Sequence, residues 1–203
     1  ILTHDSVGVG EDGPTHQPVE TVASLRAIPN LYVIRPADGN ETSGAYKIAV
    51  QKRKAPTLMC FSRQGLRNLP GSSIDAVAKG AYTVSDSDGT PELILIGTGS
   101  EVQLCEDAAE KLRGEGKKVR VVSMPCWKLD VELDAAYKES VLPKAVKKRL
   151  VVEAMSSFGW AKYFGDEGDM ISVDTFGASA PGGKVMEEFG YTIDNVVARA
   201  KAL

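Results

Sequence analysis

The sequence predicts an α/β fold built on a mainly parallel sheet. Two short, continuous apolar runs, residues 31–34 and 93–96, are typical of parallel strands that are buried on both faces, and residues 119–124 are predicted to form a further strand. Segments with helical spacing separate these runs, which is the order of βαβ units. The chain has 203 residues, 43% hydrophobic and 25% charged, so it is an ordinary globular protein of one large domain or one and a half small ones.

In the first third of the chain, helix and strand signals alternate. Proline is favoured in the first turn of a helix, and it opens a predicted helix over residues 18–27. Residues 31–34 form the first buried strand. Asp38, with a glutamate three residues later, has the spacing of a capping box, and it predicts a helix to about residue 52. A second strand is predicted over residues 57–61.

Three polar side chains follow strands in this part of the chain. His4 follows residues 1–3, which resemble the end of a strand, while Asp38 and Arg63 follow the next two strands. Open α/β sheets bind ligands at the carboxyl ends of their strands. We therefore expect His4, Asp38 and Arg63 at the edge of the sheet where a ligand binds.

A domain boundary is predicted near residue 72. The sequence Leu-Pro-Gly-Ser-Ser over residues 69–73 has the composition of a linker. Residues 1–70 carry eight Lys/Arg against six Asp/Glu, whereas the rest carries sixteen against twenty-one. We therefore divide the chain into residues 1–72 and 73–203. The first unit is too small to bury a large fraction of its surface without further chain.

The second unit is predicted to hold a mainly parallel five-stranded sheet. Its expected strands are residues 80–84, 93–96, 119–124, 150–153 and 170–173. Its expected helices are residues 100–115, 136–147, 182–189 and 192–202. Ser100 and Gln103 have capping-box spacing at the start of the first of these helices.

Residues 4–16 are predicted to form a polar loop that binds a ligand. They hold both histidines of the chain, three carboxylates and three glycines, and their only large apolar residues are Val7 and Val9. Two apolar residues are too few for a helical stripe or a buried strand. A solvated turn is the alternative, but titratable side chains on a loop held by a rigid scaffold favour a binding site.

The residue types of this loop favour a sugar or a sugar phosphate over a metal ion. His4 and His16, with Asp5 or Asp12, could hold a metal, but their spacing matches no established ligand pattern. Histidines and carboxylates can instead bond to neighbouring sugar hydroxyls. The planar guanidinium of Arg63 suits a phosphate group.

The glycine-rich segment over residues 97–101 is better explained as a structural turn than as a phosphate loop. It joins a strand to a helix N-terminus, which favours anions. It lacks the third glycine of a dinucleotide-binding motif and the Gly-Lys-Ser/Thr of a P-loop. The carboxylate of Glu101 would also repel a phosphate.

Composition argues against two classes of partner. The net charge of −3 and the pI near 5.5 argue against general nucleic-acid binding. No apolar run reaches the roughly 20 residues of a membrane span. Cys60, Cys105 and Cys126 are widely spaced and odd in number, which suits buried free thiols in a reducing compartment. The chain starts at Ile1 rather than at a methionine, and residues 1–3 resemble the end of a strand, so we expect a piece of a longer protein. No signal or transit peptide is visible in the sequence.

Several stretches of the chain closely resemble the transketolase family. Residues 3–8 (THDSVG) and 10–18 (GEDGPTHQP) resemble its most specific signature. The resemblance covers essentially the whole chain, and several stretches are most similar to plant and algal plastid forms. It continues at residues 35–41, 62–64, 97–101, 139–143 and 175–181.

The resemblance implies a three-domain, thiamine-diphosphate-dependent enzyme. Such an enzyme transfers a two-carbon ketol unit from a ketose phosphate to an aldose phosphate, in the pentose phosphate pathway or the Calvin–Benson cycle. Residues 1–72 would be the end of the α/β pyrimidine-binding domain, and residues 73–203 the C-terminal domain. The ligands of the diphosphate and of Mg²⁺ or Ca²⁺, and the glutamate that activates the cofactor, would lie outside this chain.

The family signature also implies roles for four side chains. His4 and Arg63 would bind the sugar phosphate group, and Asp12 would meet the C2 hydroxyl of the acceptor. His16 would be the catalytic residue of this chain, near the aminopyrimidine of the cofactor and the reacting carbonyl. A proton carrier with an unperturbed pKa of about 6.5 is useful there.

The resemblance further implies a homodimer that acts on sugar phosphates, in the chloroplast stroma or, alternatively, in the cytoplasm. It implies no role for nucleic acid or membranes. The alternative is a non-catalytic module for dimerisation or regulation. The intact loop over residues 4–16 favours the enzyme, although we expect this chain alone to be inactive.

Overall fold

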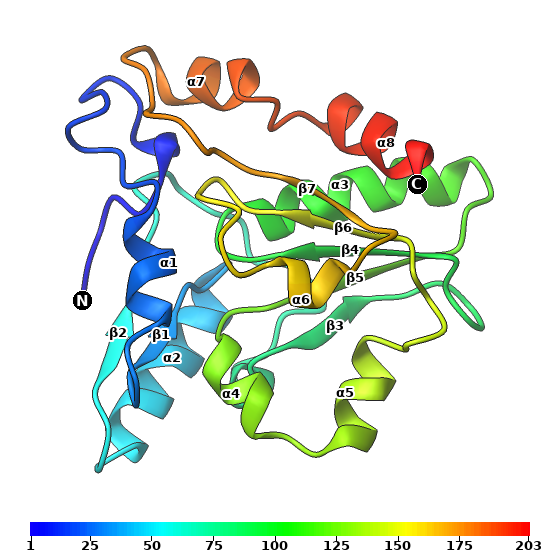
Figure 1. Ribbon diagram of the computed structural model, residues 1–203, viewed down its shortest axis with the longest axis horizontal. Helices are drawn as coiled ribbons and strands as arrows, with labels where there is room; N and C mark the ends of the chain where they lie inside the picture. Colours follow the sequence, from blue (N-terminus) through cyan, green and yellow to red (C-terminus); the bar gives the residue numbers. More distant parts are fainter.

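The computed structural model describes residues 1–203 and contains two sheets (Figure 1). Two parallel strands, β1 (Tyr32–Ile34) and β2 (Thr57–Met59), form the smaller sheet. The larger sheet has the order β3-β5-β4-β6-β7, and its strands are β3 (Tyr82–Ser85), β4 (Leu93–Gly97), β5 (Val119–Ser123), β6 (Arg149–Val152) and β7 (Asp169–Ile171). Only β3 runs antiparallel to its neighbour, so the predicted mainly parallel, five-stranded sheet is confirmed.

Eight α-helices connect and cover these strands. They are α1 (Thr21–Arg26), α2 (Gly39–Gln51), α3 (Glu101–Gly114), α4 (Trp127–Glu132), α5 (Ala135–Val141), α6 (Ala161–Phe164), α7 (Gly182–Glu188) and α8 (Ile193–Ala202). Short 3₁₀ turns, Val7–Val9 and Ala76–Lys79, complete the set.

The predicted helices differ from the observed ones in three ways. α1 begins at Thr21 rather than at Pro18, because the carbonyl of Val19 accepts a hydrogen bond from the Ser156 N–H at 3.0 Å. α5 ends at Val141 instead of residue 147, where a proline follows. The short helices α4 and α6 were not predicted.

The central strand β4 is buried on both faces of the larger sheet. Leu95, which lies opposite Leu150 in β6, packs with residues of α3, α7 and α8 on one face. Ile96 points to the other face and packs with Trp160 and Tyr163, beside α6. Both β4 side chains are fully buried, and each such burial contributes about 1.5–3 kcal/mol. This double burial explains why the strand reads as a continuous apolar run.

The smaller sheet and α2 share a core with α4. Residues of β1, α2 and β2 pack against Cys126 and Leu129 beside and within α4. The Arg35 N–H, directly after β1, donates to the Pro125 carbonyl at 2.9 Å. The predicted linker is packed as well, because Leu69 is buried and its N–H donates to Asp38. Leu69 also packs against Tyr82 and Val84 of β3, so the predicted linker lies in packed structure between the two sheets.

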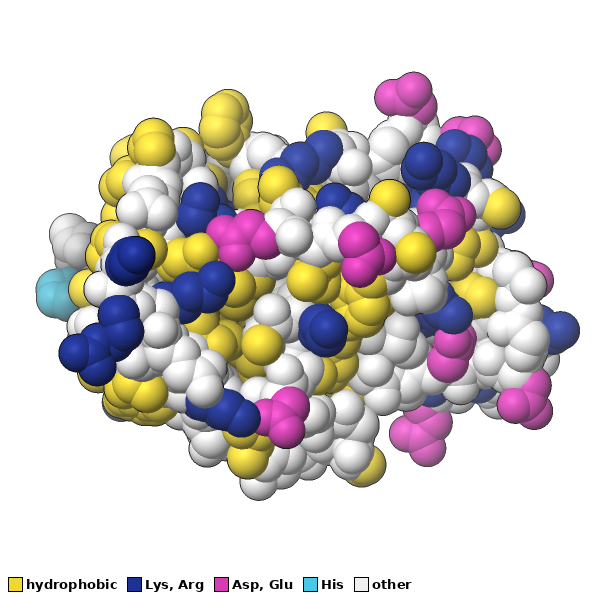
Figure 2. All heavy atoms as spheres, turned by 90° about the horizontal axis from the view of Figure 1, so that it is seen from below, with side chains coloured by type: hydrophobic (Ala, Val, Ile, Leu, Met, Phe, Trp, Pro, Cys, Tyr) yellow, Lys and Arg dark blue, Asp and Glu magenta, His cyan; other side chains and the backbone are white.

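The face of the molecule that Figure 2 shows has no continuous patch of positive or of negative charge. Figure 2 shows acidic and basic side chains interspersed over this face, with apolar atoms between them. None of the helices is both long enough and apolar enough to cross a membrane.

All three cysteines are free and buried, as predicted. Burial raises the pKa of the Cys60 thiol to about 11, with the charge of Asp5 adding to the effect, and burial raises the pKa of Cys105 well above its usual value. A thiol reacts as its thiolate, so none of the three is activated.

The native chain should therefore show no fast-reacting thiol at pH 8. Titration with a disulfide reagent should detect three thiols only after denaturant is added, because unfolding restores exposure and the ordinary pKa. If one thiol per native chain reacted rapidly, the burial of all three cysteines would be contradicted.

Candidate functional site

The loop over residues 4–16 lies beyond the carboxyl ends of β1 and β2. Leu2 forms a parallel bridge to Cys60, directly after β2, and the loop leaves from there. The Ser6 hydroxyl accepts a hydrogen bond from the Gly8 N–H and caps the 3₁₀ turn Val7–Val9. Val7 is fully buried and packs into the core of the larger sheet. The loop is thus fixed to both units by its few apolar residues.

Residues 177–182, which lead into the first residue of α7, brace this loop from the other side. The Gln17 side-chain amide donates to the carbonyls of Gly10 at 2.7 Å and Ala178 at 2.9 Å. The Ser179 hydroxyl donates to the Glu11 carbonyl at 2.6 Å. A side chain at Gly10, which has a φ of 85°, would clash with the backbone of α7. Figure 1 shows the segment before α7 beside the loop.

The structure places two of the four candidate residues in one hollow. Asp12 and Arg63 line a depression of about 210 Å³ beside Glu11 and Gly182. Both side chains are exposed in this chain, and none of the ion pairs in the structure involves either of them. Their charges are therefore available to a ligand.

The two histidines are not part of the lining of this hollow. His4 is partly exposed, and its Nδ1 lies 2.8 Å from the Thr3 hydroxyl. His16 is exposed, and its Nδ1 lies 2.9 Å from the Thr15 hydroxyl. In each ring the other nitrogen, Nε2, has no partner within the chain.

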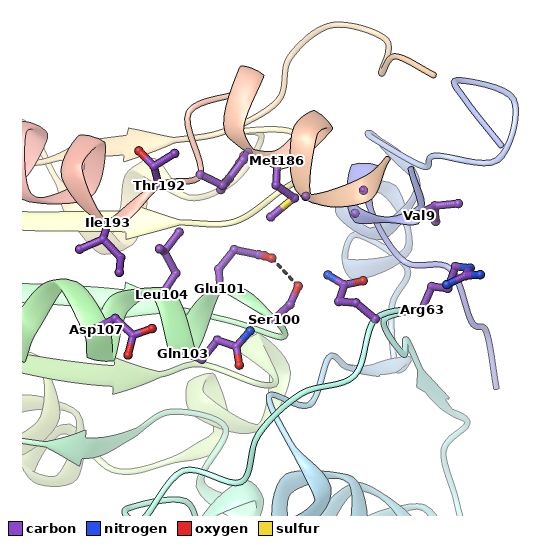
Figure 3. A pocket seen from close by; sticks show the side chains of 15 residues that line it. Val9, Arg63, Ser100, Glu101, Gln103, Leu104, Asp107, Met186, Thr192 and Ile193 are labelled. Carbon is purple, nitrogen blue, oxygen red and sulfur yellow. Dashed lines mark hydrogen bonds between the residues drawn. The ribbon is translucent and has the colours of Figure 1, made fainter. Parts of the chain in front are cut away.

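Arg63 also lines a larger cavity of about 610 Å³ between the loop, α3 and α7 (Figure 3). It lies at one end of this cavity, and Asp107 and Ile193 lie at the other. Leu104 and Met186 contribute apolar surface from α3 and α7. Arg63 thus stands where the two hollows meet.

Asp38 does not belong to the site, contrary to the prediction from its position after a strand. Its Oδ1 accepts from the Glu41 N–H at 2.9 Å and caps α2, as the sequence spacing predicts. Its Oδ2 accepts from the Leu69 N–H at 2.9 Å. Because both oxygens are used and the side chain is buried, Asp38 cannot bind a ligand.

The glycine-rich turn after β4 encloses the buried side chain of Arg35. The Arg35 Nη1 donates to the Thr98 carbonyl at 2.7 Å and to the Glu101 carboxylate. A Cβ atom at Gly99, whose φ is 57°, would lie 2.6 Å from the guanidinium carbon. The structural turn predicted for residues 97–101 is therefore observed, with a cation of this chain at its centre.

The predicted capping box at the start of α3 is wrong. Ser100 has helical backbone angles, and its side chain caps no backbone N–H. Its hydroxyl donates instead to the Glu101 carboxylate at 2.5 Å. The buried ion pair of Glu101 with Arg35 thus takes up the side chain that would otherwise cap the helix.

Arg35 belongs to a buried cluster of two cations and three carboxylates. Its Nε donates to Asp5 at 2.6 Å, and Glu153, directly after β6, lies 3.9 Å away. Arg26, the last residue of α1, forms two hydrogen bonds with Glu153 at 2.8 and 2.9 Å. The cluster occupies the carboxyl ends of β4 and β6, the crevice where open α/β sheets bind ligands.

Burial and charge act in opposite directions on the pKa values of this cluster. Burial lowers the pKa of Arg35, but Asp5 and Glu101 raise it well above its usual value, so the guanidinium stays charged. Burial raises the pKa of Glu101 more than Arg35 lowers it. For Glu153, the two arginines outweigh burial and lower the pKa. Sequence reasoning missed this cluster because nothing near these residues marks them as buried.

The structure holds no group of three or more His, Cys, Asp or Glu side chains arranged to bind a metal ion. Asp5, one of the carboxylates considered for a metal site, is paired with Arg35. The fold and the loop define an α/β protein in which two units meet at a polar, glycine-rich loop with exposed histidine and aspartate side chains, and the exposed Arg63 lies beside that loop.

Comparison with known proteins identifies this class more closely. Residues 1–68 match the transketolase pyrimidine-binding domain family, and residues 80–192 match the transketolase-like C-terminal domain family. The chain is 69% identical to a transketolase of Nostoc sp. over its whole length, and 58% identical over 99% of its length to a chloroplastic transketolase of Solanum tuberosum. The chain covers 31% and 27% of these two relatives.

A solved structure of a transketolase from Leishmania mexicana superposes with a TM-score of 0.94 and is 50% identical. The superposition covers 99% of this chain and 29% of that protein. The chain belongs to the transketolase family. It spans about a third of the length of the curated relatives that it matches.

Replacing Arg35 by methionine should lower the free energy of unfolding of this chain by about 3–5 kcal/mol, because Asp5 and Glu101 would stay buried without their cation. Urea denaturation followed by circular dichroism measures the change. The matched control is Lys111→Met, which removes an exposed partner of Asp194 and should lower the free energy of unfolding far less, because solvent screens an exposed ion pair. Equal losses of unfolding free energy in the two variants would show that the buried cluster contributes no more to stability than an exposed ion pair does.

Proposed function

We propose that the full-length protein containing this chain is a thiamine-diphosphate-dependent transketolase that moves a two-carbon ketol unit from a ketose phosphate to an aldose phosphate. The observation that carries the proposal is the loop over residues 4–16. It is complete in a chain 69% identical to a transketolase, and contacts from the second unit brace it. Residues 1–72 would complete the pyrimidine-binding domain, and residues 73–203 would form the C-terminal domain.

In this proposal, Arg63 and His4 bind the phosphate group of the sugar. An arginine presents a planar fork of N–H donors that matches a phosphate, and Arg63 is exposed at the junction of two hollows. Asp12, in the smaller hollow, accepts a hydrogen bond from the C2 hydroxyl of the acceptor aldose. The depression would thus bind both the phosphate group and the C2 hydroxyl of the sugar substrate.

His16 is proposed to hold and move a proton next to the reacting carbonyl. Its Nδ1 is engaged by Thr15, so Nε2 is the atom that faces outward and can exchange a proton. The ring is exposed in this chain, as a group that meets a cofactor held by another domain should be. An imidazole exchanges protons near neutral pH, which suits this role.

The chain fits only one side of the proposed cofactor. His16 offers a donor or acceptor to the aminopyrimidine, whereas the glycine-rich turn after β4, at the start of α3, is filled by Arg35. The ligands of the diphosphate and of Mg²⁺ or Ca²⁺ are therefore proposed to lie outside this chain. When bound, the cofactor supplies the carbon nucleophile that accepts the ketol unit.

The proposed assembly is a homodimer, and the proposed location is the chloroplast stroma, with the cytoplasm as the alternative. The chloroplastic transketolase of Solanum tuberosum supports the first location, and the more similar Nostoc protein supports the alternative. Under either location, a role in the Calvin–Benson cycle or the pentose phosphate pathway follows from the proposed reaction.

The full-length protein should turn over xylulose 5-phosphate with ribose 5-phosphate when thiamine diphosphate and Mg²⁺ are present. Residues 1–203 alone should not, because the proposed cofactor ligands lie elsewhere. A coupled assay that follows glyceraldehyde 3-phosphate measures both. A full-length protein that binds the cofactor but shows no turnover would favour a dimerisation or regulatory module instead.

Asp12→Ala in the full-length enzyme should collapse the preference for ribose 5-phosphate over 2-deoxyribose 5-phosphate. A hydrogen bond to a charged group contributes about 1.5–3 kcal/mol, so kcat/KM for the natural acceptor should fall about 10- to 150-fold. The deoxy sugar, which lacks the hydroxyl, should lose far less. If kcat/KM falls equally for both acceptors, Asp12 only shapes the turn before Gly13.

A further inference from the structure

His4 has a backbone conformation that is uncommon for residues other than glycine. Its φ is 63°, in the left-handed region that favours glycine. Such a conformation persists only when the surrounding structure holds it in place. The contacts on both sides of His4 therefore decide where its imidazole lies.

A short bridge fixes the chain before His4. The Leu2 N–H donates to the Met59 carbonyl at 2.8 Å, and the Phe61 N–H donates to the Leu2 carbonyl at 2.8 Å. These bonds attach Leu2 to the end of β2. They set the direction in which the chain enters the loop.

A buried ion pair fixes the chain after His4. Oδ2 of Asp5 accepts from the Arg35 Nε at 2.6 Å, and both side chains are almost wholly buried. Oδ1 of Asp5 has no hydrogen-bond partner in the chain. The orientation of this carboxylate, and with it the backbone next to His4, therefore depends on Arg35.

The second unit in turn holds Arg35. The turn after β4 binds its guanidinium through the Thr98 carbonyl and the Glu101 carboxylate. Glu101 is itself fixed, because its Oε2 accepts from the Ala154 N–H, just after β6, at 2.9 Å. An unbroken series of buried polar contacts thus runs from the larger sheet to the residue beside His4.

The helix that follows the loop is fixed to the same place. Arg26, at the end of α1, binds Glu153, and its guanidinium carbon lies 4.4 Å from the ring centre of Trp127. The aspartate beside His4 and the end of the helix after His16 therefore both connect to side chains at the carboxyl ends of β4 and β6. Asp5 is next to His4 in the sequence, so the contact of Asp5 with Arg35 acts on His4 more directly than the contact of Arg26 with Glu153 does.

We propose that Asp5 and Arg35 are positioning residues for His4, and that the second unit acts on the sugar phosphate site through them. The proposal rests on the proposed function, in which His4 binds the phosphate group of the substrate. It gives the crevice at the ends of β4 and β6 a role in orienting the loop rather than in binding a ligand of its own.

The test uses the full-length enzyme with two donors, xylulose 5-phosphate and hydroxypyruvate, which lacks the phosphate. Asp5→Ala should raise KM for xylulose 5-phosphate about 10-fold or more, within the range of one charge-assisted hydrogen bond, and change KM for hydroxypyruvate less than about twofold. Asp5→Asn keeps an acceptor for the Arg35 Nε and should restore most of the difference. The control Asp86→Ala removes another aspartate–arginine contact, with Arg120, and should change neither value.

A double-mutant cycle shows whether Asp5 acts through His4. His4→Ala should raise KM for xylulose 5-phosphate, and adding Asp5→Ala should then raise it no further. Additive effects, or equal losses with both donors, would overturn the proposal and leave Asp5 a purely structural role. If His4→Ala leaves KM for xylulose 5-phosphate unchanged, the phosphate role of His4 fails, and the positioning role fails with it.

A second variant covers the case in which Asp5→Ala does not fold. Arg35→Lys keeps the positive charge of the cluster, but a single ammonium group cannot reproduce the planar fork that bonds to Asp5, Thr98 and Glu101 together. It should shift the ratio of the two KM values in the same direction as Asp5→Ala. An unchanged ratio in a folded, cofactor-binding Arg35→Lys enzyme would overturn the proposal.

Discussion

The ion pair of Arg35 with Asp5 and Glu101 is the contact on which the arrangement of the two units depends. Asp5 belongs to the loop of the first unit, whereas Glu101 opens α3 in the second, and a single buried guanidinium bonds to both. A charge without a partner in a protein interior is costly, so the units cannot separate here without leaving charges unpaired. The core shared by β1, α2 and α4 adds apolar contact, which is not directional. The planar guanidinium adds direction, and it fixes the loop relative to the larger sheet.

The second unit has the crevice of a ligand-binding sheet, but side chains of the first unit fill it. The carboxyl ends of β4 and β6 form the crevice where many open α/β sheets bind a ligand, and the turn after β4 has the glycines of such a site. Here Arg35 fills the turn, and Arg26 lies beside it on Glu153. The second unit thus contributes to the candidate site through support of the loop, both at this crevice and through residues 177–182.

The support leaves the groups proposed for chemistry unengaged. Asp12 and Arg63 line the same hollow without pairing, and both histidines keep Nε2 free. The polar groups that shape the loop, by contrast, are buried and bonded, as Gln17 is to two carbonyls. A rigid frame with free polar groups at its surface is what substrate binding requires, because a misplaced group loses much of its effect.

The sequence by itself determined the strands, most of the helices and the loop that carries the candidate residues, because these depend on local patterns. Apolar runs specify strands buried on both faces, and the spacing of Asp38 and Glu41 specifies the start of α2. The short helices α4 and α6 escaped prediction because their aromatic residues, Trp127, Trp160 and Tyr163, are ordered by packing on one another. Only the tertiary structure decided the roles of the buried charges. Asp5 and Arg35 are 30 residues apart, Arg35 and Glu101 are 66 apart, and Arg26 and Glu153 are 127 apart. A charged side chain in a sequence indicates solvent, and its burial becomes favourable only when the fold brings a partner of opposite charge to it.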